Sequence, residues 1–388
     1  MNRKLINLLF TGIIVYALFV PKVKAQVIPF NEENWENKAQ GVIMEPFKGY
    51  QSVYLSNGAI ILKDVTFLNG TIEYDVYLDD RRGFQGILFR MEDGQNYEEV
   101  YLRPHQSGNP DAMQYTPVFN GRSGWQLYHD QGTAVFDGQT SWKVAPQNGY
   151  NAIYEYPFDR WLHVKLEIYG TTAQVYFDHE EEPTLIIPEL KHGTKAGGIG
   201  LKAARSPVHY ANFTYTSSDK PLSINTSNRA ANPEGMIDSW QLSSTFEEKL
   251  LDKQLQLDKK FVSAQQWTKL DAEHGGLINI SRAKTASREK NTVLAKVIIK
   301  ANQAQIKRLN LGYSDRIRVY CNGQILYSGN NGFRTRDYRY LGTIGLFDSV
   351  YLPLKKGDNE IVIAVSDNFG GWGLMGQLEN ESGISVKL

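Results

Sequence analysis

Apolar and polar residues alternate along the first half of the chain. The segments 70–78 and 161–168 each place an apolar residue at every second position. A period of two is that of a β-strand with one buried face and one outer face. The stretch that begins at Gly170-Thr171 turns and alternates again, which predicts the second arm of a hairpin.

Short strand patterns of this kind recur between turn signals from Gln26 to Ser217, and no helical period is sustained there. Aromatic residues make up 12% of the chain, with 22 Tyr and 7 Trp. Such residues pack well on pleated surfaces. The pattern therefore predicts an all-β fold, as a sandwich or barrel.

The second half of the chain also reads as strands, after a stretch rich in Ser, Asn, Pro and Gly. Asn322-Gly323 is a strong hairpin turn within it. The segment 246–261 is ambiguous between a short helix and strands. The expected organisation is a signal peptide (1–25), a β-sandwich (26–217), a linker (218–236) and a second jelly-roll β-sandwich (237–388).

The N-terminus has the pattern of an export signal. Arg3 and Lys4 precede an apolar run from Leu5 to Val20, and small residues lead to a cleavage point after Ala25. An uncleaved anchor is the alternative. We expect a secreted, periplasmic or cell-surface protein, with no membrane span once the signal is removed.

The composition disfavours some classes of partner. Cleavage removes four basic residues, leaving 38 against 42 acidic ones and a net charge of −4. Without a basic stripe, nucleic acid is not an expected partner. The single Cys321 cannot form an internal disulfide, and its strand context predicts a small buried side chain.

The stretches "FDRWLHVKLEIYGTTAQVYFDHEE" and "AGGIGLKAARSPVHYANFTYT" carry a family resemblance. This part of the chain, about 27–217, resembles the concanavalin A-like lectin/glucanase superfamily. It is most similar to the laminin G-like and 3-keto-disaccharide hydrolase-like branch. The resemblance implies two curved antiparallel sheets, with ligands on the concave face or its rim loops.

The strand-loop-strand segment 96–129 is the most site-like part of the first domain. We expect Glu99, Tyr101, Arg103 and His105 to share one strand face, joined by Arg90 from the strand before. Flat rings that stack on sugars, together with planar polar groups that bond hydroxyls, would suit an oligo- or polysaccharide. The alternative is a salt-bridge lattice on an outer face. The predicted ligand-binding residues are Arg90, Glu99, Tyr101, Arg103, His105, Asn109, Asp111, Gln114, Tyr115, Asn120, Trp125 and Tyr128.

The sequence does not identify a set of catalytic residues. Glucanases of this fold carry three carboxylates as Glu-Xaa-Asp-Xaa-Xaa-Glu, whereas Leu78 replaces the third one after Glu73 and Asp75. These two acids are therefore expected to be solvated strand residues. His105 with Glu99 or Asp111, and Arg103 to steady an anion, form a weaker candidate for proton abstraction.

No cofactor or metal is predicted. The sequence lacks a zinc helix, a nucleophile elbow and a Cys-Xaa-Xaa-Cys pair. Laminin G-like relatives often bind calcium at a rim, but the spacing of Asp79, Asp80 and Asp178 does not support a calcium site.

The second domain has its own resemblance, carried by Asn322-Gly323 and by "LKKGDNEIVIAV" leading to "FGGWG". It resembles the galactose-binding-like jelly rolls, which implies a sandwich that binds carbohydrate or braces its neighbour. The Gly371–Gly376 stretch matches a dinucleotide fingerprint only in form, because no βαβ unit can follow it. The candidate ligand residues are Arg334, Arg336, Asp337, Tyr338 and Trp372, with an interdomain contact as the alternative.

Three functions remain open from the sequence. The first is a secreted, non-catalytic carbohydrate-binding or glycan-associated protein. The second is a saccharide hydrolase or lyase that uses the region of Glu99, Arg103 and His105. The third is a structural surface protein that binds other proteins. The sugar and the oligomeric state cannot be inferred from these residues.

Overall fold

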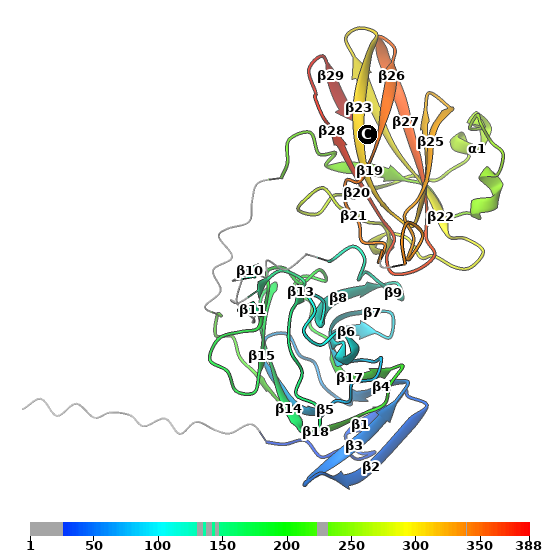
Figure 1. Cartoon of the computed structure of the whole chain (residues 1–388). Coiled ribbons are helices and arrows are strands. Elements are labelled where there is room, and N and C mark those ends of the chain that lie inside the picture. The colour runs from blue at the N-terminus through cyan, green and yellow to red at the C-terminus, as the bar shows by residue number, and fades with distance from the viewer. Residues whose placement is uncertain (1–25, 130–134, 137–141, 144–146, 223–231, 339) are drawn as a thin grey trace, which may run out of the picture.

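The computed structural model describes residues 26–129, 135–136, 142–143, 147–222, 232–338 and 340–388. The expected signal peptide and most of the expected linker lie outside them. The described chain forms two β-sandwiches, one above the other in Figure 1. Strands up to Ser217 build the first sandwich and strands from Ser239 build the second. The predicted all-β fold with two sandwiches is confirmed.

Two eight-stranded sheets face each other in the first sandwich, and the alternation noted in the sequence sets which side of each strand is buried. Sheet 1 runs, in spatial order, through β1 (Trp35–Asn37), β4 (Gly58–Leu62), β17 (Gly198–Ala204), β6 (Phe84–Asp93), β7 (Asn96–Leu102), β8 (Met113–Phe119) and β13 (Asn151–Ala152), with β9 (Arg122–Ser123) beside β8. Sheet 2 runs through β12 (Gln147–Asn148), β16 (Leu185–Ile187), β15 (Thr172–Phe177), β14 (Trp161–Tyr169), β5 (Gly70–Tyr77), β18 (Val208–Ser217), β3 (Tyr50–Ser56) and β2 (Gly41–Phe47). A separate pair joins β10 (Val135–Phe136) to β11 (Trp142–Lys143).

The core of the first sandwich lies between these sheets. The apolar positions of β5 and β14 are fully buried in it, as their period of two predicts. The predicted hairpin at Gly170 is also confirmed, because β14 and β15 pair antiparallel up to Tyr169 and Thr172. A 3₁₀ turn, η1 (Pro104–Gln106), follows β7.

A larger and a smaller sheet form the second sandwich. Sheet 3 runs through β20 (Thr268–Asp271), β19 (Ser239–Leu242), β22 (Thr292–Ala301), β27 (Gly357–Ser366), β24 (Arg316–Cys321) and β25 (Gln324–Asn330), with β29 (Ile384–Lys387) beside β22. Sheet 4 runs through β21 (Ile278–Asn279), β28 (Gly373–Leu378), β23 (Gln305–Ser314) and β26 (Asp348–Leu354). The ambiguous segment 246–261 supplies η2 (Glu248–Leu251) and the start of α1 (Lys259–Ser263), and η3 (Ile280–Arg282) follows β21.

Sequence expectations hold at two points of the second sandwich. Asn322 and Gly323 both have positive φ and connect β24 to β25 as a hairpin. Cys321 is buried in the core. None of the helices in the described part of the chain has the length and hydropathy needed to cross a membrane.

The two sandwiches meet at the segment 120–128, which follows β8. Gln126 is fully buried there, and all of its polar groups bond to the second sandwich. Its backbone N–H donates to Gly370 (2.9 Å) and its carbonyl accepts from Ile344 (2.9 Å). Its amide donates to the Leu341 carbonyl (2.7 Å) and accepts from the Ser314 hydroxyl (3.1 Å). This segment fixes the contact between the two halves.

Candidate functional site

The outer side of sheet 1 gathers a group of polar and aromatic side chains, which we call the Glu99 face. On β7, Val100 and Leu102 point into the core, so Glu99 and Tyr101 point outward. Neighbouring strands and the loop after β7 add the rest. The Glu99 face comprises Phe84, Tyr97, Glu99, Tyr101, Arg103, His105, Asp111, Gln114 and Lys202.

Two ion pairs lie on this face. Lys202 on β17 donates from Nζ to both carboxylate oxygens of Glu99 (2.7 and 2.9 Å), and Glu99 is only 1% exposed. Although burial lowers the pKa of Lys202, the charge of Glu99 raises it above its usual value. Arg103 pairs with Asp111 across the turn that joins β7 to β8. Glu99, Arg103 and Asp111 are buried and Lys202 is partly exposed, and burying such charges carries a desolvation cost.

A neutral hydrogen-bond pair lies between them. The Tyr101 hydroxyl donates to Gln114 Oε1 (2.7 Å), and these residues are direct cross-strand neighbours on β7 and β8. The Gln114 amide then donates to the carbonyls of Trp125 (2.9 Å) and Tyr128 (3.0 Å). The Glu99 face is thus bonded to the interdomain segment through backbone groups.

Aromatic rings border the polar groups. Phe84 on β6 is half-buried and lies edge-on to Tyr101 (5.8 Å between centroids) and to His105 (5.4 Å). The Arg103 guanidinium lies 5.8 Å from the Phe84 ring centroid. Tyr97 is half-buried, and burial, followed by the charge of Glu99, raises its pKa to about 12.

His105 is neutral at pH 7. Burial and then the nearby charges of Arg103 and Arg82 lower its pKa to about 4. Its Nδ1 atom is buried without a hydrogen-bond partner. A neutral imidazole with so low a pKa is a weak base, which weighs against the proposed proton abstraction.

Arg90 does not join this face, which corrects one expectation. A bulge in β6 gives Arg90 a positive φ of 48°, so the alternation breaks at this residue. Its side chain is fully buried and donates to the carbonyls of Leu68 (2.9 Å), Gly193 and Gly170 (2.7 Å). Arg90 therefore ties loops of the first sandwich together.

Tyr115 and Asn109 also lie apart from the face. Tyr115 is buried in the core and its hydroxyl donates to the fully buried Glu98 (2.7 Å). Burial raises the pKa of Glu98 to about 7. Asn109 is exposed at the tip of the loop before Asp111, beside the face.

Asn120, Trp125 and Tyr128 belong to the contact between the sandwiches, which corrects a second expectation. Asn120 donates to the Ser281 carbonyl (2.7 Å), and the Trp125 ring lies 5.9 Å from that of Phe369. Tyr128 is 1% exposed. Its hydroxyl donates to Glu273 (2.7 Å). Tyr128 is therefore closed to a ligand, and the partly exposed Trp125 ring packs against Phe369 of the other sandwich.

The candidate ligand residues of the second sandwich also divide into a buried residue and a group on an exposed loop. Trp372 is fully buried in the core, and its indole N–H donates to the Val365 carbonyl (3.0 Å), which removes it from a surface site. Arg334, Arg336, Asp337 and Tyr338 are exposed on one loop, where Arg336 pairs with Asp348. The glycines beside Trp372 pack on the first sandwich instead: a Cβ on Gly370 would lie 2.5 Å from the Gln126 side chain.

Sequence reasoning missed Phe84 and Lys202 as members of the Glu99 face. Each holds an outward position on a strand that the pattern predicts, but only the pairing of β17 and β7 with β6 brings them together. Their alternation marked them as outward-facing, and nothing local marked them as neighbours of Glu99.

A second cluster, on the outer side of sheet 2, was also missed. His163 on β14 bonds to Asp75 (Nδ1 to Oδ1, 2.7 Å) and to Glu73 (Nε2 to Oε2, 3.2 Å) of β5. Burial lowers the pKa of His163, but these two carboxylates raise it to about 9 overall. The His163 hydrogen bond lowers the pKa of Glu73. Glu73 and Asp75 are therefore ion-paired, and not simply solvated as the sequence suggested.

Metal ligation finds no support among the described residues, where no three His, Cys, Asp or Glu side chains are grouped to hold an ion. Of the acids considered for calcium, Asp79 pairs with Arg81 and Asp178 pairs with Arg160.

Comparisons with solved structures give similar folds for about half of the chain. A carbohydrate-binding module from Bacillus subtilis is 16% identical over 47% of this chain and 96% of its own, with a TM-score of 0.34. A β-glucanase from Bacillus licheniformis is 11% identical over 50% of this chain and 96% of its own, with a TM-score of 0.31. A putative glycosyl hydrolase from Parabacteroides distasonis is 12% identical over 48% and 89%, with a TM-score of 0.31.

A scan against family models and a search of curated proteins each gave no match. At the identities and TM-scores of the solved structures, the likeness concerns the fold alone. Evidence about activity has to come from the side chains of this chain.

Proposed function

We propose that this chain is an exported, non-catalytic saccharide-binding protein, and that the saccharide lies on the Glu99 face. The observation that carries the proposal is that two largely buried ion pairs, Glu99–Lys202 and Arg103–Asp111, lie on the outer side of one sheet. Buried ion pairs are a weak source of stability, so their place on an outer face is better explained by recognition.

The accessible groups around these pairs suit a sugar. Phe84 and Tyr97 are half-buried rings, and the Lys202 side chain is 27% exposed. Rings stack against the apolar face of a pyranose, while ammonium, carboxylate and amide groups bond its hydroxyls. Both kinds of group border this face, as saccharide recognition requires.

Binding is favoured over hydrolysis by the charge states. Glycoside hydrolysis needs a carboxylic acid that stays protonated beside an ionised one. On the Glu99 face the two carboxylates are each paired with a cation, and His105 is a weak base. On the opposite sheet the pKa of Glu73 is lowered, so this group is not a proton donor at neutral pH.

A glycan array probed with the mature chain tests the proposal, followed by affinity measurements with the best glycan. Glu99→Gln is expected to raise Kd by at least about tenfold, because it breaks the charge pair with Lys202. Glu45→Gln is the matched control, since Glu45 is a partly exposed carboxylate on sheet 2, outside the Glu99 face.

Two results would overturn the proposal. Absence of binding to every glycan would favour the alternative of a protein-binding surface protein. Release of products from an oligosaccharide, lost in His105→Ala, would favour the hydrolase or lyase alternative.

A further inference from the structure

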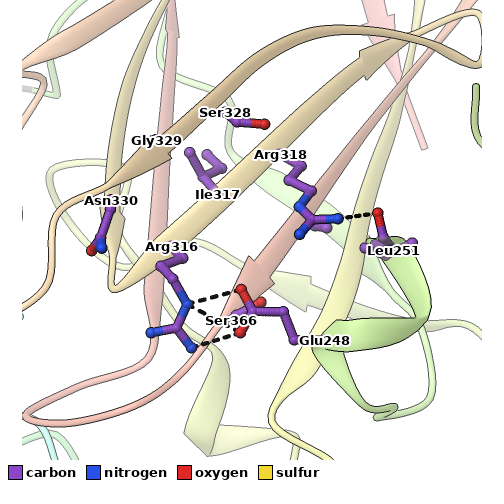
Figure 2. A pocket seen from close by; sticks show the side chains of 10 residues that line it. Glu248, Leu251, Arg316, Ile317, Arg318, Ser328, Gly329, Asn330 and Ser366 are labelled. Atoms are coloured by element: carbon purple, nitrogen blue, oxygen red, sulfur yellow. Dashed lines mark hydrogen bonds and ion pairs between the residues drawn. The ribbon is translucent and has the colours of Figure 1, made fainter. Parts of the chain in front are cut away.

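A hollow of about 310 Å³ opens on the outer side of sheet 3, far from the Glu99 face in sequence. Its floor is made by β24, β25 and β27, and η2 closes one side, as Figure 2 shows. Apolar residues of the segment from Phe246 to Val262 cover the neighbouring part of this sheet. The hollow is therefore a gap left between a sheet face and the segment that covers it.

The charged groups in the hollow are held in place by one another. Arg316 donates from Nε to Glu248 Oε1 (2.8 Å) and from Nη2 to Oε2 (2.6 Å). Although burial raises the pKa of Glu248, the hydrogen bonds from Arg316 lower it overall. Arg318 donates to the Leu251 carbonyl and to Asp252 (2.8 Å). Figure 2 shows both arginines reaching toward η2.

Polar groups without a bond remain at the opposite side. Among the hydrogen bonds of the described residues, none involves Arg316 Nη1, Asn330 Nδ2 or Ser328 Oγ. Asn330 and Arg316 are direct cross-strand neighbours, as are Ser328 and Arg318. Ser328 and Asn330 are exposed, so these groups line the open side of the hollow with donors and, at the serine, an acceptor that a ligand can reach.

We propose that this hollow is a second ligand site, for a neutral hydroxyl-rich molecule of about the size of one monosaccharide. Glu248 and Asp252 offset the charges of Arg316 and Arg318, so the hollow has no net charge that would favour an anion or a cation. Hydroxyl groups donate and accept at once, so they match a lining in which donors and acceptors are paired. The volume lies at the lower end of the range of ligand pockets, which limits the ligand to a small molecule.

The test uses the full mature chain and ligand-observed NMR with glucose, galactose, mannose and fucose as separate probes. At least one sugar is expected to bind. Ser328→Trp fills the hollow and is expected to weaken that binding at least about tenfold. Ser349→Trp is the matched control, because Ser349 is exposed on β26 of the other sheet.

Asn330→Ala decides the matter if Ser328→Trp does not fold, and Glu99→Gln separates this site from the Glu99 face. The expected result is weaker sugar binding in Asn330→Ala than in the wild type, and a further loss when Asn330→Ala is added to Glu99→Gln, in which the Glu99 face is already disabled. The inference is overturned if none of the four sugars binds, if acetate or inorganic phosphate binds in their place, or if the hollow variants bind as the wild type does. A loss of monosaccharide binding in Glu99→Gln alone would assign it to the first sandwich.

Discussion

Two neighbouring stretches of this chain, 101–114 and 120–128, have the same mixture of aromatic, amide and charged residues but meet different partners. In the first stretch, Tyr101 bonds Gln114 and Arg103 pairs with Asp111, all on one outer face of the first sandwich. In the second stretch, Gln126 and Tyr128 bond to the second sandwich. A polar and aromatic composition is therefore shared by a ligand face and a domain interface.

The two stretches differ in which part of the molecule supplies their hydrogen-bond partners. In the first stretch Tyr101, Arg103 and Gln114 find partners within residues 101–128 and none in the second sandwich, which leaves the rim available to a ligand. The second stretch depends on the other sandwich for its bonds, so it stabilises the two halves together. Substitutions in the two stretches should accordingly change different properties. Two such substitutions test this contrast, with a third at Asp367, which pairs with Arg122 of the second stretch.

Tyr128→Ala is expected to have the largest effect, lowering the free energy of unfolding by about 3–5 kcal/mol. The substitution removes a buried ring and one of the hydrogen bonds to Glu273, although Lys191 (2.9 Å) and Arg282 (3.4 Å) still pair with that carboxylate. Urea unfolding of the full chain measures the loss. Tyr50→Ala, at a ring that is 41% exposed, should cost less than about 1 kcal/mol, and equal losses would contradict the interface assignment.

Asp367→Asn tests the electrostatics of the interface. Asp367 is 2% exposed, and its carboxylate lies 3.1 Å from Arg122 of the interdomain segment. Burial raises its pKa to about 6, although Arg122 lowers it. The folded state thus holds a proton that the unfolded state has lost. The stability contributed by this group is full below about pH 4 and is lost as the pH rises through 6.

A shift of this size corresponds to about 2–3 kcal/mol. Between pH 4 and pH 7, the Asn variant should therefore lose about 2 kcal/mol less stability than the wild type, as measured by urea unfolding at each pH. Asp358→Asn, at an exposed position near the start of β27, provides the control. Parallel pH profiles for wild type and Asp367→Asn would show that this carboxylate does not titrate as described.

Tyr101→Phe is expected to have the smallest effect on stability, about 1–2 kcal/mol, because it leaves the buried Gln114 Oε1 unpaired. Saccharide affinity should also fall, because the substitution removes the Tyr101 hydroxyl from the Glu99 face and leaves Gln114 Oε1 without its donor, while the Gln114 amide stays bonded to the carbonyls of Trp125 and Tyr128. Asn109→Ala, at the exposed loop tip, should change stability by less than about 0.5 kcal/mol. Unchanged affinity in Tyr101→Phe would separate the Tyr101–Gln114 pair from the site.

The sequence predicted those parts of the site that lie on strands where inward and outward residues alternate without a break. Glu99 and Tyr101 lie outward because Val100 and Leu102 fill the core, and alternation alone implies this. Arg90 was misplaced because a bulge in β6 breaks the period, and the local sequence does not mark the bulge. Trp372 was misplaced because an indole ring next to glycines suits a surface loop and a core equally well.

The His163 cluster also shows that alternation along one strand does not predict which residues of other strands lie beside it. Glu73 and Asp75 are outward residues of β5, as alternation requires. Their partner lies on β14, about ninety positions later, and only the register between the two strands places His163 opposite Asp75. The same holds for Lys202 and Glu99, which β6 separates.

The amino-acid sequence by itself determined that this protein is built from short strands in two sandwiches, and which side of most strands is buried. Both follow from local periodicity and turn residues, whose effects act within a few positions. Only the tertiary structure decided which outward side chains meet, which rings cover the other sandwich, and where a hollow remains. Those contacts join residues tens to hundreds of positions apart, and strand register and domain packing, which no local pattern encodes, bring them together.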